Sequence, residues 1–272
     1  MRSGTDIGMC TASLLAEPFT ASDADIRAAS EAAAGAGCTG LSVWSHQIAS
    51  LGDPAQLAAP VAVVEGALLW AGPDEGAAAD EARNLCAQAA AHGAWLILAV
   101  VLDAEPPEVE RARAGLGRLA ESAAEAGARV CIEFLPWSGV PSLAAAWELV
   151  GPLSDDVGIV IDAWHWQRQP GGPAPDVLAG IPGRRIVYLQ LSDAAAYPGA
   201  DQMDETMNGR LLPGAGVVDF APLLAGLDRI GADPFVTTEV FNPGIVRQRG
   251  AAGAAEAMVT AARQVLASAL PR

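Results

Sequence analysis

Eight short apolar runs alternate with helical stretches along the whole chain, and this alternation constrains the fold more than any other feature. Each run has the length and character of a buried strand, and the stretches between them carry helix start and stop signals. Strand, helix and glycine stop in repeated order predict βαβ units joined by right-handed crossovers in a parallel sheet. The runs are Ile7–Leu15, Gly40–Trp44, Val61–Trp70, Trp95–Leu102, Arg129–Pro136, Val157–Trp166, Arg185–Asp193 and Pro234–Phe241.

Eight parallel strands can close on themselves, and 272 residues is close to the roughly 250 that such a barrel needs. An open doubly wound sheet is the rival fold, and it normally has a glycine-rich phosphate-binding turn after its first strand. The residues after Ile7–Leu15 are Ala-Glu-Pro-Phe, which are not of that kind. We therefore predict an α/β fold, the (β/α)8 TIM barrel, with residues 1–272 as a single domain.

Capping residues and glycines predict where the helices begin and end. The first helix opens at Ser22, and later helices begin at Ser142 and Pro222. Two stretches without helical character, Pro170–Pro175 and Ala194–Gly216, are predicted loops. The helical stretches with the clearest bounds are Glu75–His92, Pro107–Ala126 and Glu256–Leu270.

Charge and lysine content exclude several classes of function. The formal net charge is −16, which argues against binding to nucleic acid or to an anionic membrane surface, because both attract basic faces. All 16 basic residues are arginine. A Schiff-base aldolase, a pyridoxal-phosphate enzyme and a Walker-A loop each need a lysine, so this chain fits none of these classes.

Cysteine placement and hydropathy predict a soluble, cytoplasmic protein. The four cysteines are scattered with no Cys-x-x-Cys pair, so neither a zinc ribbon nor a dense disulfide framework is expected. The N-terminal segment lacks the pattern of a signal peptide. No apolar stretch reaches about 18 residues without a charged or turn residue, so no membrane span is expected.

The last four apolar runs each carry a polar residue near their C-terminal end. The first three of these residues are 29 and 28 residues apart, about one βα unit each, and the last follows after 49 residues that include a long loop. Because active sites of barrels lie at the C-terminal ends of the strands, the four side chains are expected on one face. They are Glu133, Asp162, Gln190 and Glu239.

Three carboxylates in one buried place repel one another unless a cation lies among them. Oxygen ligands without thiolates favour Mn²⁺, Mg²⁺ or Co²⁺ over structural zinc. We therefore predict one divalent metal ion bound by Glu133, Asp162, Gln190 and Glu239. For any one of the acids alone, a helix cap or an arginine partner is the alternative explanation.

Several further residues are candidates for contact with a substrate. His165, three residues after Asp162, has the chemistry of a metal ligand, a general acid/base or a hydrogen-bonding group, with a surface loop position as the alternative. Arg210 lies in a glycine-bounded loop and suits a substrate carboxylate, phosphate or hydroxyl. His46 and Trp137 are candidate pocket residues, although a structural role explains each of them as well.

Two acids and two loops complete the predicted surroundings of the site. Asp193 is expected to support the residues that touch the metal, and Glu65 is expected to point into the pocket from the third strand. The choice of substrate is expected to lie in the loops Trp44–Leu57 and Ala194–Gly216.

Five motifs, taken together and in order, resemble those of the xylose isomerase-like barrels, the sugar phosphate isomerase/epimerase superfamily. That superfamily includes ketose 3-epimerases, inosose isomerases and dehydratases, hydroxypyruvate isomerase and 3-dehydroshikimate dehydratase. The resemblance covers nearly the whole chain. The motifs are Glu-Phe-Leu-Pro, Ile-Asp-Ala-Trp-His, Leu-Gln-Leu-Ser-Asp, Gly-Arg-Leu-Leu-Pro-Gly-Ala-Gly and Thr-Glu-Val-Phe.

The resemblance implies a function for each matched position. It implies a metal held by the four strand-end residues, a small polar carbonyl substrate contacted by His165 and Arg210, and a dimer or tetramer. In the epimerase and isomerase branches it also implies that Glu133 and Glu239 are the acid/base pair. One position departs from the pattern, because most members have a histidine where this chain has Gln190, which makes the metal set entirely oxygen-liganded.

Two enzymatic hypotheses follow, and both begin with removal of a proton next to a carbonyl. The first is an isomerase or epimerase of a sugar, a sugar phosphate or a cyclic polyol ketone. The second is a dehydratase, because Gln190 also resembles some bacterial 3-dehydroshikimate dehydratases, in which the residue matching His165 is a candidate base. A non-catalytic carbohydrate-binding barrel is the alternative from another class. The endonuclease IV branch is excluded, because its trinuclear zinc centre needs more histidines than the three present.

Overall fold

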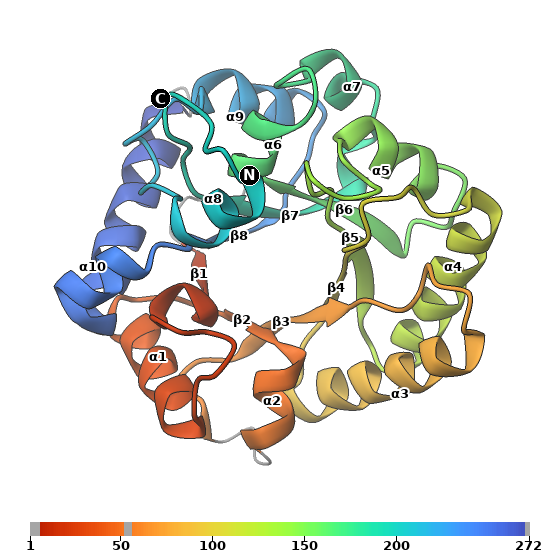
Figure 1. Cartoon of the computed structure of the whole chain (residues 1–272), viewed down its shortest axis with the longest axis horizontal. Helices are drawn as coiled ribbons and strands as arrows, with labels where there is room; N and C mark the ends of the chain where they lie inside the picture. Colours follow the sequence, from red (N-terminus) through yellow and green to blue (C-terminus); the bar gives the residue numbers. More distant parts are fainter. Residues whose placement is uncertain (1–5, 52–55, 270–272) are drawn as a thin grey trace.

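In the computed structural model, which describes residues 6–51 and 56–269, eight parallel strands form a closed barrel inside a ring of helices (Figure 1). Each strand pairs with the next, and β8 pairs with β1 to close the sheet. The predicted (β/α)8 TIM barrel is therefore confirmed. The strands are β1 Ile7–Cys10, β2 Leu41–Trp44, β3 Val61–Ala67, β4 Leu96–Ala99, β5 Arg129–Ile132, β6 Val157–Asp162, β7 Ile186–Leu191 and β8 Phe235–Thr238.

The helices lie outside the strands and return the chain from the end of one strand to the start of the next (Figure 1). Ser22 begins α1 in a reciprocal capping box with Asp25, and Gly93 ends α3 in the left-handed conformation with φ 68°. The helices are α1 Asp23–Gly35, α2 Ser45–Leu51, α3 Glu75–His92, α4 Val109–Glu125, α5 Leu143–Val150, α6 Ala163–Arg168, α7 Pro175–Ala179, α8 Gln202–Asn208, α9 Phe220–Arg229 and α10 Pro243–Ala269, with the 3-10 turns η1 Thr11–Leu14 and η3 Gly183–Arg185.

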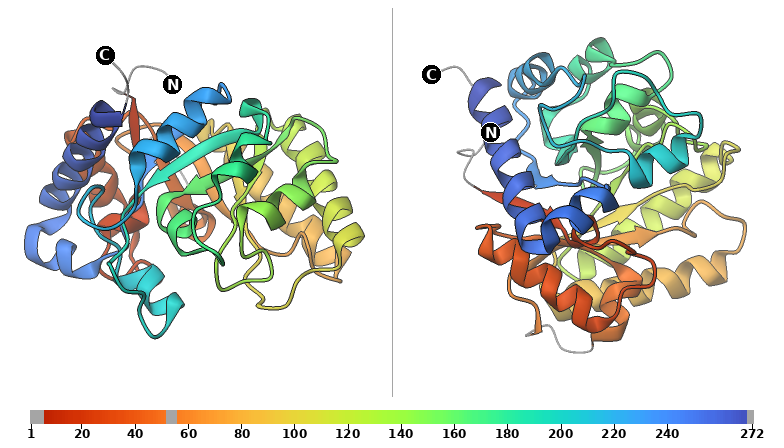
Figure 2. Two further views of the ribbon diagram at one scale, coloured as in Figure 1. Left: turned by 90° about the horizontal axis from the view of Figure 1, so that it is seen from above. Right: turned by 60° about the vertical axis from the view of Figure 1, so that its left-hand side comes forward.

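Two predicted segments near the C-terminal ends of the strands have a different structure. The run Val157–Trp166 is a strand only to Asp162, because the side chain of Asp162 caps α6 and the backbone becomes helical at once. The stretch Ala194–Gly216 is not only a loop, since it contains the two-turn helix α8. This helix projects from the rest of the molecule at one end of the barrel (Figure 2).

Other helix boundaries also differ from those predicted. Helix α10 begins at Pro243 rather than Glu256, and Gly250 (φ 68°) forms a kink between its two parts. Helix α9 begins two residues before Pro222. The predicted loop Trp44–Leu57 contains α2, and its residues 52–55 lie outside the described part of the chain.

The core has two layers, one between strands and helices and one inside the barrel. The inner layer contains side chains from β3 to β7 and the residues that follow these strands. Near the start of β8, the ring of Phe235 lies against Gly8 in β1. A Cβ at Gly8 would come within 2.5 Å of Cζ of that ring, so a larger residue does not fit there. Among the described residues, no helix combines the length and the hydropathy that a membrane crossing requires.

Candidate active site

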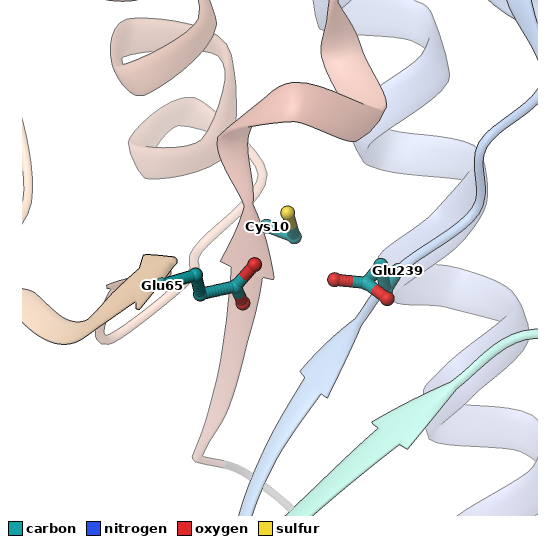
Figure 3. Close-up of side chains that lie close together, drawn as sticks. All are labelled: Cys10, Glu65 and Glu239. Carbon is teal, nitrogen blue, oxygen red and sulfur yellow. The ribbon is translucent and has the colours of Figure 1, made fainter. Parts of the chain in front are cut away.

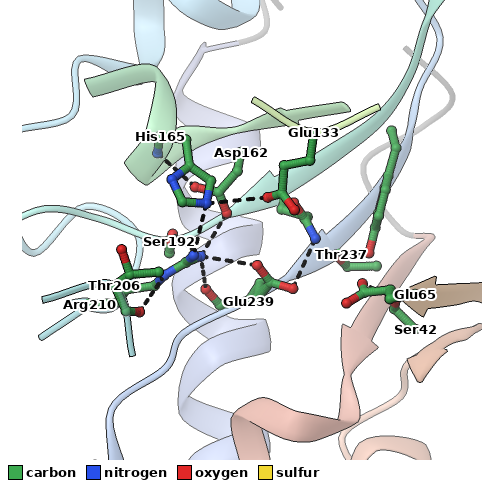
Figure 4. Close-up of polar contacts among 12 residues, drawn as sticks. Ser42, Glu65, Glu133, Asp162, His165, Ser192, Thr206, Arg210, Thr237 and Glu239 are labelled. Carbon is green, nitrogen blue, oxygen red and sulfur yellow. Dashed lines mark hydrogen bonds and ion pairs between the residues drawn. The ribbon is translucent and has the colours of Figure 1, made fainter. Parts of the chain in front are cut away.

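The four predicted metal ligands lie at the C-terminal ends of four consecutive strands, and Figure 4 shows three of them, Glu133, Asp162 and Glu239, close together. Residues two apart on a strand share a face, so each of the four continues the inward-facing row of its strand. All four side chains are buried, with at most 7% of any residue exposed. Glu133 follows β5, Asp162 ends β6, Gln190 lies in β7 and Glu239 follows β8.

Asp162 uses both carboxylate oxygens, one for the backbone and one for a side chain. Its Oδ1 accepts a hydrogen bond from the backbone N–H of His165 at 2.9 Å, which caps α6. Its Oδ2 accepts from Nη1 of Arg210 at 2.7 Å. The cap places His165 in the first turn of α6, where its side chain is 1% exposed, so the alternative of a surface loop histidine is wrong.

Arg210 places its guanidinium among the acids of the site. Nη1 donates to Asp162 and also to Oε2 and the backbone carbonyl of Glu239, both at 3.1 Å. The rings of Trp164 and Phe241 lie 5.7 and 4.8 Å from its central carbon, so the cation is enclosed by aromatic faces. Arg210 is 1% exposed, so it is buried within the site and does not lie on the surface.

His165 lies between an acid and the guanidinium. Its Nε2 is 3.3 Å from Oε1 of Glu133 and 3.3 Å from Nη2 of Arg210. Nδ1 of the same ring has no hydrogen-bond partner among the described residues. The imidazole therefore presents one nitrogen to the centre of the site, beside the oxygen of Glu133.

Two of the predicted ligands have buried oxygens without a hydrogen bond. Within the described residues, Oε1 of Glu133 and Oε1 of Gln190 accept none, although the Nε2 of Gln190 donates to Glu239 at 2.9 Å. A buried polar atom is costly unless it has a partner. In addition, ligand atoms of Glu133, Asp162 and His165 all lie within 4.8 Å of one another. This donor set fits a divalent cation.

A second polar group faces this set from the first strands of the barrel. The carboxylate of Glu65 on β3 accepts a hydrogen bond from Ser42 on β2, and it points towards Cys10 and Glu239 (Figure 3). One oxygen or sulfur atom from each of Cys10, Glu65 and Glu239 lies within 4.8 Å of the others. Glu65 points into the barrel, as expected. Cys10 and Ser42 were not predicted to lie in the site, although both occupy inward-facing positions next to Glu65.

Burial sets the protonation of the two glutamates in this group. It raises the pKa of Glu65 to about 7, although the hydrogen bond from Ser42 lowers it and the charge of Glu133 raises it further. Burial and the charge of Glu65 also raise the pKa of Glu239 well above its usual value, against the effect of Arg210. In the metal-free protein the two carboxyl groups therefore retain protons at a pH where exposed glutamates have lost them.

The raised pKa of Glu65 makes the stability of the metal-free protein depend on pH. Since the folded-state pKa of about 7 exceeds the ordinary value of 4.5, ionisation costs stability as pH rises through that window. Glu65→Gln should therefore gain several degrees of melting temperature relative to the original chain between about pH 4.5 and 7, and keep this gain above pH 7. Melting curves of both proteins with chelator, measured from pH 4.5 to 8, test this. A difference independent of pH would contradict it.

Two candidate pocket residues have contacts with aromatic and hydroxyl side chains. His46 is exposed on α2, with its ring 5.6 Å from that of Trp44. Trp137 is partly buried, packs against the inner core and donates from Nε1 to Thr206 on α8 at 3.2 Å. A contact of either residue with a substrate remains a prediction.

Asp193 supports the loop after β7 and not the metal set directly. Its two carboxylate oxygens accept four backbone N–H groups, from Ala194, Gly214, Gly216 and Val218, at 2.8–2.9 Å. A fully buried carboxylate thus holds both ends of the segment that carries Arg210.

The sequence profile described as the xylose isomerase-like TIM barrel matches residues 5–267, which is nearly the whole chain. The chain belongs to this family. Among curated relatives, inosose isomerase of Bacillus subtilis is 29% identical over 131 residues, covering 47% of this chain and 45% of the relative. The 3-dehydroshikimate dehydratase of Pseudomonas putida is 30% identical over 141 residues, covering 50% of this chain and 22% of the relative. The match to the first of these relatives thus spans about half of its length, and the match to the second spans less.

Solved structures of other proteins have the same fold. The IOLI protein, whose crystal structure contains a zinc atom, superimposes with a TM-score of 0.79 at 19% identity, covering 98% of this chain and 100% of that protein. At this identity the likeness establishes the fold alone.

Proposed function

We propose that this chain is a divalent-metal-dependent enzyme that isomerises or epimerises a sugar, a sugar phosphate or a cyclic polyol ketone. The observation that carries the proposal is that Oε1 of Glu133 and Oε1 of Gln190, both buried, accept no hydrogen bond within the described residues, in a site that also contains Asp162 and Glu239. The activities of relatives such as the inosose isomerase of Bacillus subtilis support the substrate class.

The proposed metal ligands are Glu133, Asp162, Gln190 and Glu239. Their oxygen donors favour Mn²⁺, Mg²⁺ or Co²⁺. When bound, such an ion would polarise a substrate carbonyl and so acidify the neighbouring C–H group.

Two side chains are the proposed proton carriers, and two others are proposed to bind the substrate. Glu133 is the proposed acceptor of the substrate proton, through the carboxylate oxygen that does not bind the metal. Glu239, which accepts from Arg210, is the proposed donor that returns a proton to the substrate. Arg210 and His165 would bind and orient substrate oxygens, because Nη2 of the one and Nε2 of the other meet at the centre of the site.

A dehydratase is the second candidate, favoured by the position of His165. Its Nε2 lies 3.3 Å from Oε1 of Glu133, so the imidazole can reach the same substrate proton. If His165 removes it and a β-hydroxyl leaves, the product is a conjugated enone. The 3-dehydroshikimate dehydratase of Pseudomonas putida supports this reading, as does Gln190 in the metal set.

A substrate panel in deuterated water tests both candidates. Purified protein with added Mn²⁺, Mg²⁺ or Co²⁺ would be incubated with ketoses, ketose phosphates, inososes and 3-dehydroshikimate, and followed by proton NMR and ultraviolet absorbance. An isomerase incorporates deuterium without new absorbance, whereas a dehydratase produces an absorbing product. Absence of turnover together with absence of bound metal would overturn the enzymatic proposal in favour of a carbohydrate-binding barrel.

A further inference from the structure

A buried ion pair joins the two helices beside the site. Nε and Nη2 of Arg168, at the end of α6, donate to the same oxygen of Glu205 on α8, at 3.0 and 2.6 Å. The side chains of both residues are at most 7% exposed. Helix α6 is the helix that Asp162 caps and that carries His165, so the pair connects this part of the site to α8.

The same two side chains also hold the loop that leads into α8. Nη2 of Arg168 donates to the backbone carbonyl of Ala195 at 2.7 Å, near the end of β7. The second oxygen of Glu205 accepts from the backbone N–H of Gly199 at 2.7 Å. The pair therefore fixes this segment at three points.

From α8 the contacts continue to Arg210. The backbone carbonyl of Thr206, the residue after Glu205, accepts a hydrogen bond from Nε of Arg210 at 3.0 Å. In addition, the ring of Trp164 lies 5.8 Å from the central carbon of Arg168 and 5.7 Å from that of Arg210. Thus α8, which contains Glu205, also bonds Arg210 through its backbone, and the ring of Trp164 lies next to both arginines.

We infer that Arg168 and Glu205 are positioning residues, which hold α8 against α6 so that Arg210 reaches the acids of the site. The inference rests on the proposed function only for its effect on turnover, since the effect on Arg210 itself follows from the contacts. Removal of one partner leaves a buried charge unpaired, and such a charge moves towards water. The displaced α8 would then take the carbonyl of Thr206 away from Arg210.

Chemical modification of Arg210 tests the placement without any assay of activity. Phenylglyoxal reacts with accessible guanidinium groups, and Arg210 is almost fully buried. In Glu205→Gln we expect modification of Arg210, located by peptide mass spectrometry, to be roughly tenfold faster or more, because local opening governs access to a buried group. Continued protection of Arg210 would overturn the inference. Arg168→Lys retains the charge but not the forked geometry, and an intermediate rate is expected for it.

The matched control is Asp155→Asn, which removes the carboxylate partner of another buried arginine. Asp155 bonds Arg185 at 3.1 Å, just before β6 and so at the opposite end of the barrel. This variant should lower the melting temperature without exposing Arg210. If it exposes Arg210 as much as Glu205→Gln does, the effect is general loosening and the inference fails.

A double-mutant cycle then separates positioning from a merely structural role. With a substrate from the panel, Glu205→Gln should raise KM more than it lowers kcat, as expected when a binding group is misplaced. In an Arg210→Gln background it should cause no further loss of kcat/KM, because Glu205 acts through Arg210. Multiplicative losses would contradict the inference. If no substrate is turned over, the proposed function fails, and the modification rates still decide the positioning.

Discussion

Glu133→Gln is expected to reduce kcat/KM by about a thousandfold or more, because it removes the proposed proton acceptor, which is also a proposed metal ligand. The amide keeps the size of the side chain, and it replaces a carboxylate whose Oε1 accepts no hydrogen bond within the described residues. The barrel should therefore stay folded, with an unchanged or higher melting temperature in the absence of metal. Kinetics on a panel substrate, Mn²⁺ titration calorimetry and melting curves measure the three effects.

The control for this substitution is Glu108→Gln, which removes the exposed carboxylate that caps α4. It should lower stability slightly by loss of a helix cap and leave kcat/KM unchanged. Retention of more than about a tenth of kcat/KM by Glu133→Gln would show that another group takes the proton. In that event His165→Gln becomes the decisive variant, since Nε2 of His165 lies 3.3 Å from Oε1 of Glu133.

Arg210→Met is expected to have the largest effect on stability. The guanidinium donates to Asp162 and Glu239, both buried, so its removal leaves two carboxyl groups without their cation. Breaking a buried ion pair in this way lowers the free energy of unfolding by about 3–5 kcal/mol. For a chain of this size, that loss lowers the melting temperature by about 10 °C. Added Mn²⁺ should restore more of the melting temperature in the variant than it adds to the original chain, because it supplies positive charge to the same acids.

The comparison that isolates this charge effect is Arg185→Met, which removes a buried arginine from the other end of the barrel. That variant should also lose stability, but Mn²⁺ should raise its melting temperature only as much as it raises that of the original chain. Equal recovery of both variants, or a fall of less than about 2 °C for Arg210→Met in chelator, would show that the acids do not depend on Arg210.

The strands and their inward-facing residues could be predicted because both follow from local sequence. Apolar runs of strand length repeat eight times, and a polar residue in such a run has to lie where water or a partner reaches it. Helix α8 could not be predicted in this way. Its seven residues, Gln202–Asn208, include only two large apolar side chains, and its position depends on the pair Arg168–Glu205, which joins residues 37 positions apart.

The roles of the polar residues were harder to predict than their positions. Arg210 and Asp193 were placed near the site from their motifs, but the partners of each come from other parts of the chain. No spacing rule indicates that Asp193 accepts four backbone N–H groups or that Arg210 donates to two proposed metal ligands. For the same reason Cys10 and Ser42, which have no charge, gave no signal until Glu65 was seen beside them.

The four proposed ligands occupy consecutive strands, β5 to β8, and so they form an arc around half of the barrel and not a full ring. Backbone hydrogen bonds hold neighbouring strands about 4.8 Å apart, so the width of this arc does not depend on the loops. The other half consists of β1 to β4, from which Cys10, Ser42 and Glu65 face the arc (Figures 3 and 4). A molecule bound beside the arc has these four strands as its other wall. Substitutions on this other half of the barrel therefore offer a way to change which molecule binds, while the four proposed ligands stay unchanged.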